Sequence, residues 1–278
     1  MQEQQPPTQT YALGHAPKEI QRLLVQGQMI NPFTQHMLKE AGITTGMNVL
    51  DLGCGPGEVS LIAAELVGAT GSVLGIDTNP DVLQLAHARA QDAGFKHASF
   101  LASDIRELAL DQEYDAIVGR LILLYLPERL AILRRLTQHL RPGGVVAFQE
   151  YDMAGAADTT LPHSPFFEQV WTWMTQAFQR AGVEIRMGMK LHSTFLEADL
   201  PAPHLRHEAD IGAGPDWLGY EVLANVVRAL LPLIVKFGIA TAEEVDIETL
   251  ADRLREEIVS HNGVARSPAL ISAWVRKS

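Results

Sequence analysis

The sequence predicts an α/β protein with a doubly wound sheet, mostly parallel with an antiparallel last strand, and with helical insertions that form a lid. Two observations support this prediction. Between residues 47 and 153, short apolar segments typical of buried strands alternate with amphipathic helical segments, and a glycine-rich turn follows the first strand. Strand, helix and strand at this rhythm imply parallel pairing with right-handed crossovers.

The elements of this sheet can be assigned from their hydrophobic pattern and their end signals. Asn79 is a suitable capping residue directly before Pro80, and Gly94 marks the end of the same helix. The predicted strands are 48–52, 72–76, 98–102, 116–118 and 145–149, and the predicted helices are 58–67, about 80–94 and 128–140.

The segments around this core are predicted to be helical additions. Residues 1–45 form an N-terminal tail and short cap helices that are interrupted near Pro32, and residues 46–278 form the main domain. Insertions at about 158–200 and 214–262 are expected to form a substrate lid. They contain predicted helices at 165–180, 216–237 (kinked by Pro232) and 242–260, and further strands are expected at 204–211 and 270–276.

Composition and charge exclude several classes of protein. No apolar run is long enough to span a bilayer, and the N-terminus lacks the pattern of a secretion signal, so we expect a cytoplasmic protein without a membrane partner. The net charge of −11 argues against a nucleic-acid partner. The single cysteine, Cys54, excludes a disulfide framework and a multi-thiolate zinc site, and no metal is expected. The oligomeric state stays open, with a homodimer as one option.

The glycine-rich turn is the first candidate binding element. Gly53, Gly55 and Gly57 follow a buried strand, where bare backbone lets a ligand approach and the next helix directs its free amide groups toward the gap. The spacing lacks the third glycine of the dinucleotide fingerprint and the Lys-Ser/Thr ending of a phosphate-binding loop. A pyrophosphate ligand is therefore disfavoured.

Acidic residues at successive strand ends extend this site. Asp77 follows the second strand, where a carboxylate can accept hydrogen bonds from both hydroxyls of a ribose. Asp104 follows the third strand, within reach of an adenine amino group. Either residue alone can instead cap a neighbouring helix or turn. Together with the glycine turn they indicate an adenosine site, because open α/β sheets bind ligands at the carboxyl ends of their strands.

These features resemble the class I S-adenosylmethionine-dependent methyltransferases, which have a Rossmann-like fold, and especially their ubiquinone-biosynthesis-type small-molecule branch. The resemblance is strong over 47–153 and extends weakly to 268–277. It implies S-adenosyl-L-methionine as the cofactor and S-adenosyl-L-homocysteine as the product. The stretches that carry it, in order, are 49–57, 75–77, 102–104, 114–120 and 140–144.

The resemblance also implies roles for individual residues. Asp51 would orient the turn or reach the cofactor's amino group through water, and Arg120 would contribute its backbone beside the methionine moiety. An N-terminal cap would bring Tyr11 and Gln28 over the cofactor. The implied cofactor-binding set is Tyr11, Gln28, Asp51, Gly53, Cys54, Gly55, Gly57, Asp77, Thr78, Ser103, Asp104, Ile105 and Arg120.

The acceptor is narrowed mainly by exclusion. No Asn/Asp-Pro-Pro-Tyr follows the fourth strand, which argues against the exocyclic-amine methylators of DNA and of protein glutamine. One cysteine is too few for familiar arsenic methylation. Candidate catalytic residues are Tyr125, Glu150 and His192, although a capping, surface or core role fits each of them as well. We predict direct in-line methyl transfer to an O, N or C atom of a small molecule, such as an intermediate of secondary metabolism.

Another class of function fits the same motifs. A protein can keep the cofactor fold without methylating, as a cofactor-dependent cyclase or a binding module does. Turnover of S-adenosylmethionine to S-adenosylhomocysteine distinguishes the two classes.

Overall fold

The computed structural model describes residues 17–277, and these contain a seven-stranded sheet in the order β3-β2-β1-β4-β5-β10-β7. β10 runs antiparallel to both of its neighbours, β5 and β7, whereas the other neighbouring strands are parallel. The prediction of a mostly parallel sheet with an antiparallel last strand is confirmed. The strands are β1 (Asn48–Leu52), β2 (Ser72–Asp77), β3 (Ala98–Ala102), β4 (Tyr114–Arg120), β5 (Leu140–Asp152), β7 (His204–Glu208) and β10 (Ala269–Arg276).

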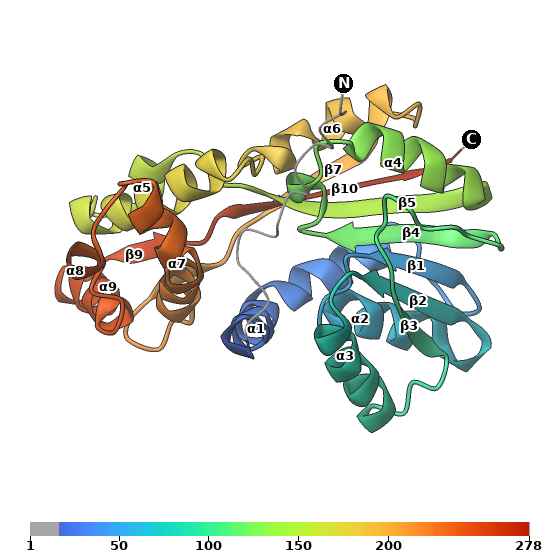
Figure 1. Ribbon diagram of the computed structural model, residues 1–278, viewed down its shortest axis with the longest axis horizontal. Helices are drawn as coiled ribbons and strands as arrows, with labels where there is room; N and C mark the ends of the chain where they lie inside the picture. The colour runs from blue at the N-terminus through green and yellow to red at the C-terminus, as the bar shows by residue number, and fades with distance from the viewer. Residues whose placement is uncertain (1–16, 278) are drawn as a thin grey trace, which may run out of the picture.

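Helices cover both faces of this sheet (Figure 1). They are α1 (Pro17–Glu40), α2 (Glu58–Val67), α3 (Pro80–Asp92), α4 (Arg129–Leu136) and α6 (Met187–Glu197). Residues of α1, α2 and α3 share one hydrophobic cluster with Val49, and residues of α4 and α6 share the opposite one with Leu50. The two faces alternate along β1 because successive side chains of a strand point to opposite sides.

A second lobe projects from one end of the sheet, at the left in Figure 1. It consists of α5 (Pro165–Arg180), α7 (Gly219–Lys236), α8 (Ala242–Val245), α9 (Leu250–Ser260) and a small antiparallel sheet of β6 (Thr160–Leu161), β9 (Val264–Arg266) and β8 (Ile211–Ala213). Helices α5, α7 and α9 pack on one another, and α1 contacts α7. We call this part of the molecule the lid lobe.

Three details differ from the expectations from sequence. α1 is one helix that continues through Pro32, and the missing amide affects only the carbonyl of Gln28, whose side chain is exposed. The segment 242–260 is two helices, because Asp246 adopts a left-handed conformation (φ 41°) after α8. α6 packs on β5 and β10 and so belongs to the sheet's helical layer, although it lies within the segment expected to form the lid. No helix within residues 17–277 is both long and apolar enough to cross a bilayer.

Candidate functional site

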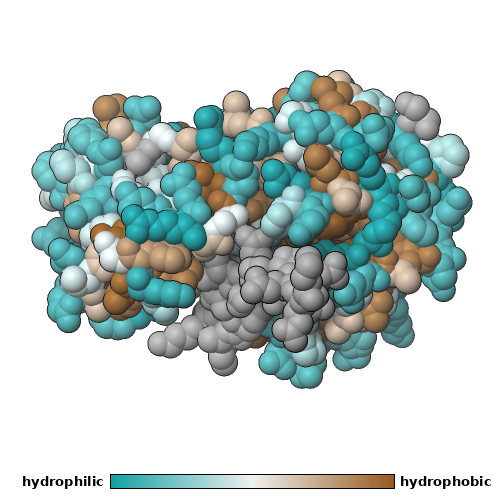
Figure 2. Space-filling model, turned by 45° about the horizontal axis from the view of Figure 1, so that its top comes forward, coloured by the Kyte–Doolittle hydropathy of each residue, from teal (hydrophilic) through white to brown (hydrophobic). Residues whose placement is uncertain are grey.

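A cavity of about 1400 Å³ lies where the carboxyl ends of the strands meet the lid lobe. The loops after β1, β2, β3 and β4 form one end of it, and α1, α5 and α7 form most of the rest, with contributions from the end of β5 and from β9. Asp77 and Asp104 line the cavity at the strand ends, whereas Trp171 and Phe178 line it on α5. The surface seen in Figure 2 is mostly hydrophilic, with scattered hydrophobic groups. The cavity therefore combines a polar end at the sheet with an apolar end in the lid lobe.

The glycine turn forms the floor of the polar end. Gly53 and Gly55 have φ values of +66° and +51°, and a Cβ on Gly53 would lie 2.7 Å from Cδ1 of Ile122. Asp51 supports the turn from behind, because its Oδ2 accepts a 2.6 Å hydrogen bond from Ser60 of α2. Burial raises the pKa of Asp51 to about 7, and its other oxygen has no partner among the described residues. The turn thus presents bare backbone to the cavity.

Asp77 is held at the end of β2 by two backbone amides. Its Oδ2 accepts a hydrogen bond from the amide of Gly55 at 3.0 Å, and its Oδ1 accepts one from the amide of Asn79 at 2.9 Å. Each carboxylate oxygen can accept more than one hydrogen bond, and the residue lines the cavity. This fixed carboxylate fits the two hydroxyls of a ribose.

Asp104 is engaged within its own turn. Nε of Arg106 donates to both carboxylate oxygens at 3.0 Å, and the amide of Arg106 donates to Oδ1 at 2.8 Å. These hydrogen bonds hold the pKa of Asp104 below its ordinary value. Both residues line the cavity, so an adenine amino group would have to share Asp104 with Arg106.

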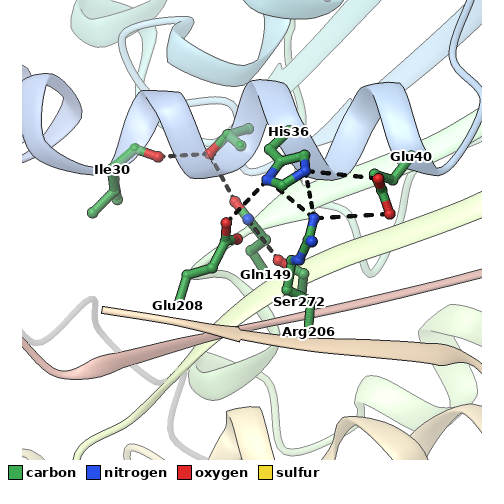
Figure 3. A network of polar contacts seen from close by, with 8 residues as sticks. Ile30, His36, Glu40, Gln149, Arg206, Glu208 and Ser272 are labelled. Atoms are coloured by element: carbon green, nitrogen blue, oxygen red, sulfur yellow. Dashed lines mark hydrogen bonds and ion pairs between the residues drawn. The ribbon is translucent and has the colours of Figure 1, made fainter. Parts of the chain in front are cut away.

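α1 is fixed above the polar end by a chain of hydrogen bonds that reaches across three elements (Figure 3). Thr34 donates to Oε1 of Gln149 on β5, and Nε2 of Gln149 donates to Ser272 on β10, each at 2.7 Å. All three side chains are fully buried. Towards the surface, ion pairs join α1 to β7 through His36, Glu40, Arg206 and Glu208. The helix is therefore part of the cavity wall.

The structure brings together most of the residues expected at the cofactor. Asp51 and Gly57 lie behind the turn and do not line the cavity. Tyr11 lies outside the described residues. Those that line the cavity are Gly53, Cys54, Gly55, Asp77, Thr78, Ser103, Asp104, Ile105 and Arg120.

The expectation for Gln28 is not met. Its side chain is exposed, and the buried Gln26 lines the cavity instead, with Nε2 donating to the hydroxyl of Tyr151 at 3.1 Å. The α1 residues that line the cavity recur at helical spacing, at 22, 23, 26, 29 and 30. That periodicity was the signal in the sequence that would have found Gln26.

Of the three candidate catalytic residues, only one lies in the wall of the cavity. Tyr125 lines the cavity. Glu150 does not: it faces the α4 and α6 layer, where its Oε1 accepts hydrogen bonds from the amides of Ile122 at 3.0 Å and Leu123 at 2.7 Å. Burial raises the pKa of Glu150 to about 8. The expectation that Glu150 faces an acceptor is therefore wrong.

His192 is also misplaced as a candidate base, because it is exposed on α6 and does not line the cavity. The residue of β5 that does line the cavity is Tyr151. Within residues 17–277, no three His, Cys, Asp or Glu side chains are grouped to hold a metal ion.

Comparison with known proteins agrees with this geometry. A family model described as a methyltransferase domain matches residues 43–195, which is more than half of the 278 residues. The chain belongs to this methyltransferase family. The expected methyltransferase family and Rossmann-like fold are confirmed.

Individual relatives match only part of their length. Arsenite methyltransferase from Aquipseudomonas alcaligenes is 37% identical over 113 residues, which cover 38% of this chain and 33% of that protein. Demethylmenaquinone methyltransferase from Lactococcus lactis is 29% identical over 146 residues, covering 50% of this chain and 55% of that protein. The chain thus spans between a third and just over half of these curated relatives.

A solved structure extends the similarity in fold. Coclaurine N-methyltransferase, bound to N-methylheliamine and SAH, superposes with a TM-score of 0.52 over 88% of this chain and 72% of that one, at 15% identity. At this identity the similarity shows the shared fold alone.

Proposed function

We propose that the protein transfers a methyl group from S-adenosylmethionine to a small, largely apolar acceptor by direct in-line displacement. The observation that supports it most is the single cavity that joins the glycine turn and Asp77 to the wall of the lid lobe. The cofactor supplies a methyl group activated by its positively charged sulfur. The chain's own residues would bind the cofactor at the polar end and hold the acceptor at the apolar end.

The lid-lobe wall suits an apolar acceptor. Trp171, Met174 and Phe178 of α5 face the cavity together with Leu223 and other aliphatic residues of α7. Among the described residues of the lid lobe, the only charged side chain in the wall is that of an arginine on β9. A wall of this kind excludes water and orients the acceptor, and orientation alone can supply roughly 7–11 kcal/mol of a barrier.

The wall offers little support for a general base. No histidine of residues 17–277 lines the cavity. Burial raises the pKa of Tyr151, so its phenol keeps its proton and is available to a substrate as a hydrogen-bond donor instead of a base. We expect the reaction to use position and exclusion of water instead of proton abstraction by a histidine or tyrosine side chain.

The arsenite relative does not favour arsenic as the acceptor here. Cys54 is the single cysteine of the chain and lies inside the glycine turn, and burial raises the pKa of its thiol well above the ordinary value. A cysteine binds a metal or metalloid as its thiolate, which a raised pKa disfavours. We keep an organic small molecule as the proposed acceptor, and a cytoplasmic, homodimeric protein remains a prediction.

Calorimetric titration with S-adenosylmethionine and S-adenosylhomocysteine tests the first half of the proposal, with micromolar binding expected. A screen of apolar phenols, amines and carboxylic acids for release of S-adenosylhomocysteine tests the second half. If neither S-adenosylmethionine nor S-adenosylhomocysteine binds, the proposal is refuted. Tight binding with no turnover across the screen would favour a cofactor-dependent cyclase or a binding module.

A further inference from the structure

Arg120 ends β4 directly beside the glycine turn. β1 and β4 are parallel with Leu52 opposite Gly119, so Gly53, the residue after β1, lies beside Arg120, the last residue of β4. Both line the cavity. At this corner of the cavity the backbone of the glycine turn lies next to α1. Asp77 lies between this corner and Asp104, the residue expected to bind the adenine.

The guanidinium of Arg120 has neutral partners. Nη1 donates to Oδ1 of Asn31 at 2.9 Å and to Oγ1 of Thr34 at 2.7 Å. Within residues 17–277, no carboxylate forms an ion pair with Arg120, and neither its Nε nor its Nη2 makes a hydrogen bond. A guanidinium can offer a planar pair of donors to a carboxylate, and these two nitrogens are the pair left over.

The acidic groups near Arg120 are already engaged. Glu58 pairs with Arg89 at 2.7 Å and accepts a hydrogen bond from Asn31. Asp51 is bonded to Ser60, and its raised pKa leaves it only partly ionised at neutral pH. A charge in a water-poor cavity is costly unless a counter-charge accompanies it. The corner therefore carries a positive charge that lacks a direct protein counter-ion.

We infer that the Arg120 side chain binds the carboxylate of the cofactor's methionine moiety. This inference rests on the proposed function, because it assigns one contact within the cofactor site. Since Asn31 and Thr34 hold the same guanidinium, the contact also links the cofactor to α1. The role differs from the backbone contribution that the family resemblance implies for this position.

A comparison of two ligands that differ only in the carboxylate tests the inference. S-adenosylhomocysteine and its decarboxylated form, S-adenosyl-3-thiopropylamine, are titrated calorimetrically into the wild type, Arg120→Gln and Arg120→Lys. We expect Arg120→Gln to weaken binding of S-adenosylhomocysteine roughly 10- to 100-fold, the size expected for a hydrogen bond between charged groups. Binding of the decarboxylated ligand should be unchanged or tighter, and Arg120→Lys should keep part of the preference for the carboxylate.

Thr34→Val is the matched control, because it removes one bond that holds the guanidinium while the charge stays. The wild-type preference for S-adenosylhomocysteine should persist in it. The inference would be overturned if Arg120→Gln lost affinity for both ligands equally or for neither. It would also be overturned if Thr34→Val lost the preference for S-adenosylhomocysteine. In each case Arg120 would be left as an anchor of α1. A wild type that binds neither S-adenosylhomocysteine nor S-adenosylmethionine would instead refute the proposed function. Thermal melts confirm that each variant is folded.

Discussion

Glu150 should make the folded protein less stable as the pH rises toward neutrality. Burial raises its pKa from an ordinary value of 4.5 to about 8. A carboxyl with a higher pKa in the folded chain binds its proton more tightly there than in the unfolded chain. Between these two pKa values the free energy of unfolding therefore falls by about 1.4 kcal/mol per pH unit from this group, and it is constant below and above them.

Glu150→Gln removes this titration while keeping the shape of the side chain. The amide oxygen can still accept from the amides of Ile122 and Leu123, and the amide nitrogen takes the place of the oxygen that has no partner among residues 17–277. The difference in free energy of unfolding between variant and wild type should grow by about 2–3 kcal/mol in favour of the variant from pH 5 to pH 7, because the variant has no proton to lose. Binding of S-adenosylhomocysteine should not change, since Glu150 lies outside the cavity.

Urea unfolding of both proteins at pH 5, 6 and 7 measures this difference. Other groups that titrate in the same range, such as Asp51, cancel in the comparison between variant and wild type. A difference that stays flat between pH 5 and pH 7 would show that the burial of Glu150 does not hold its proton. Loss of methyl transfer in a variant that is folded and binds S-adenosylhomocysteine would restore Glu150 as a catalytic residue.

Three further substitutions test the cofactor site and the lid lobe. Asp77→Ala should weaken S-adenosylhomocysteine binding at least 10-fold by calorimetry, because it removes a charged acceptor held at the strand end; wild-type affinity would refute the ribose assignment. Gly53→Ala should lower the free energy of unfolding in urea by about 1–3 kcal/mol, since φ is +66° and the new Cβ would meet Ile122. An unchanged unfolding midpoint would contradict the strained turn. Ser164→Ala should lower the free energy of unfolding by about 1 kcal/mol, because Ser164 caps α5 by accepting from the amide of Phe167 at 3.0 Å. Unchanged amide hydrogen-exchange rates in α5 would contradict a role of this cap in the lid lobe.

The parts of the molecule that could be predicted from sequence are those with local signals. The glycine turn, the cap at Asn79 and the apolar strands each carry their information within a few residues, and the structure has them where they were expected. The small sheet of β6, β9 and β8 has no such signal, because its strands are two or three residues long and come from distant segments.

The orientation of side chains was harder to predict than the elements that carry them. β5 is buried on both faces, so its apolar run does not show which residues face the cavity, and the choice between Glu150 and Tyr151 depends on the parity of the strand. In α1 the helical period groups Gln26 with residues 22, 23, 29 and 30 and apart from Gln28, but which face of the helix lines the cavity is set by its packing on α2, α7 and β5. Both decisions are made by contacts that are remote in sequence.

The antiparallel strand β10 has a consequence for how the chain is made. Its pairing with β5 extends from Ala269 opposite Asp152 to Arg276 opposite Val145, and the whole lid lobe is synthesised between the two. A nascent chain that has completed the cofactor turn therefore still exposes the long open edge of β5, which is prone to pairing with other strands until β10 emerges. A protein that lacks β10 would keep the turn at Gly53 and the carboxylate of Asp77 and yet tend to aggregate. β10 therefore protects the edge of a sheet whose cofactor-binding residues are encoded far upstream.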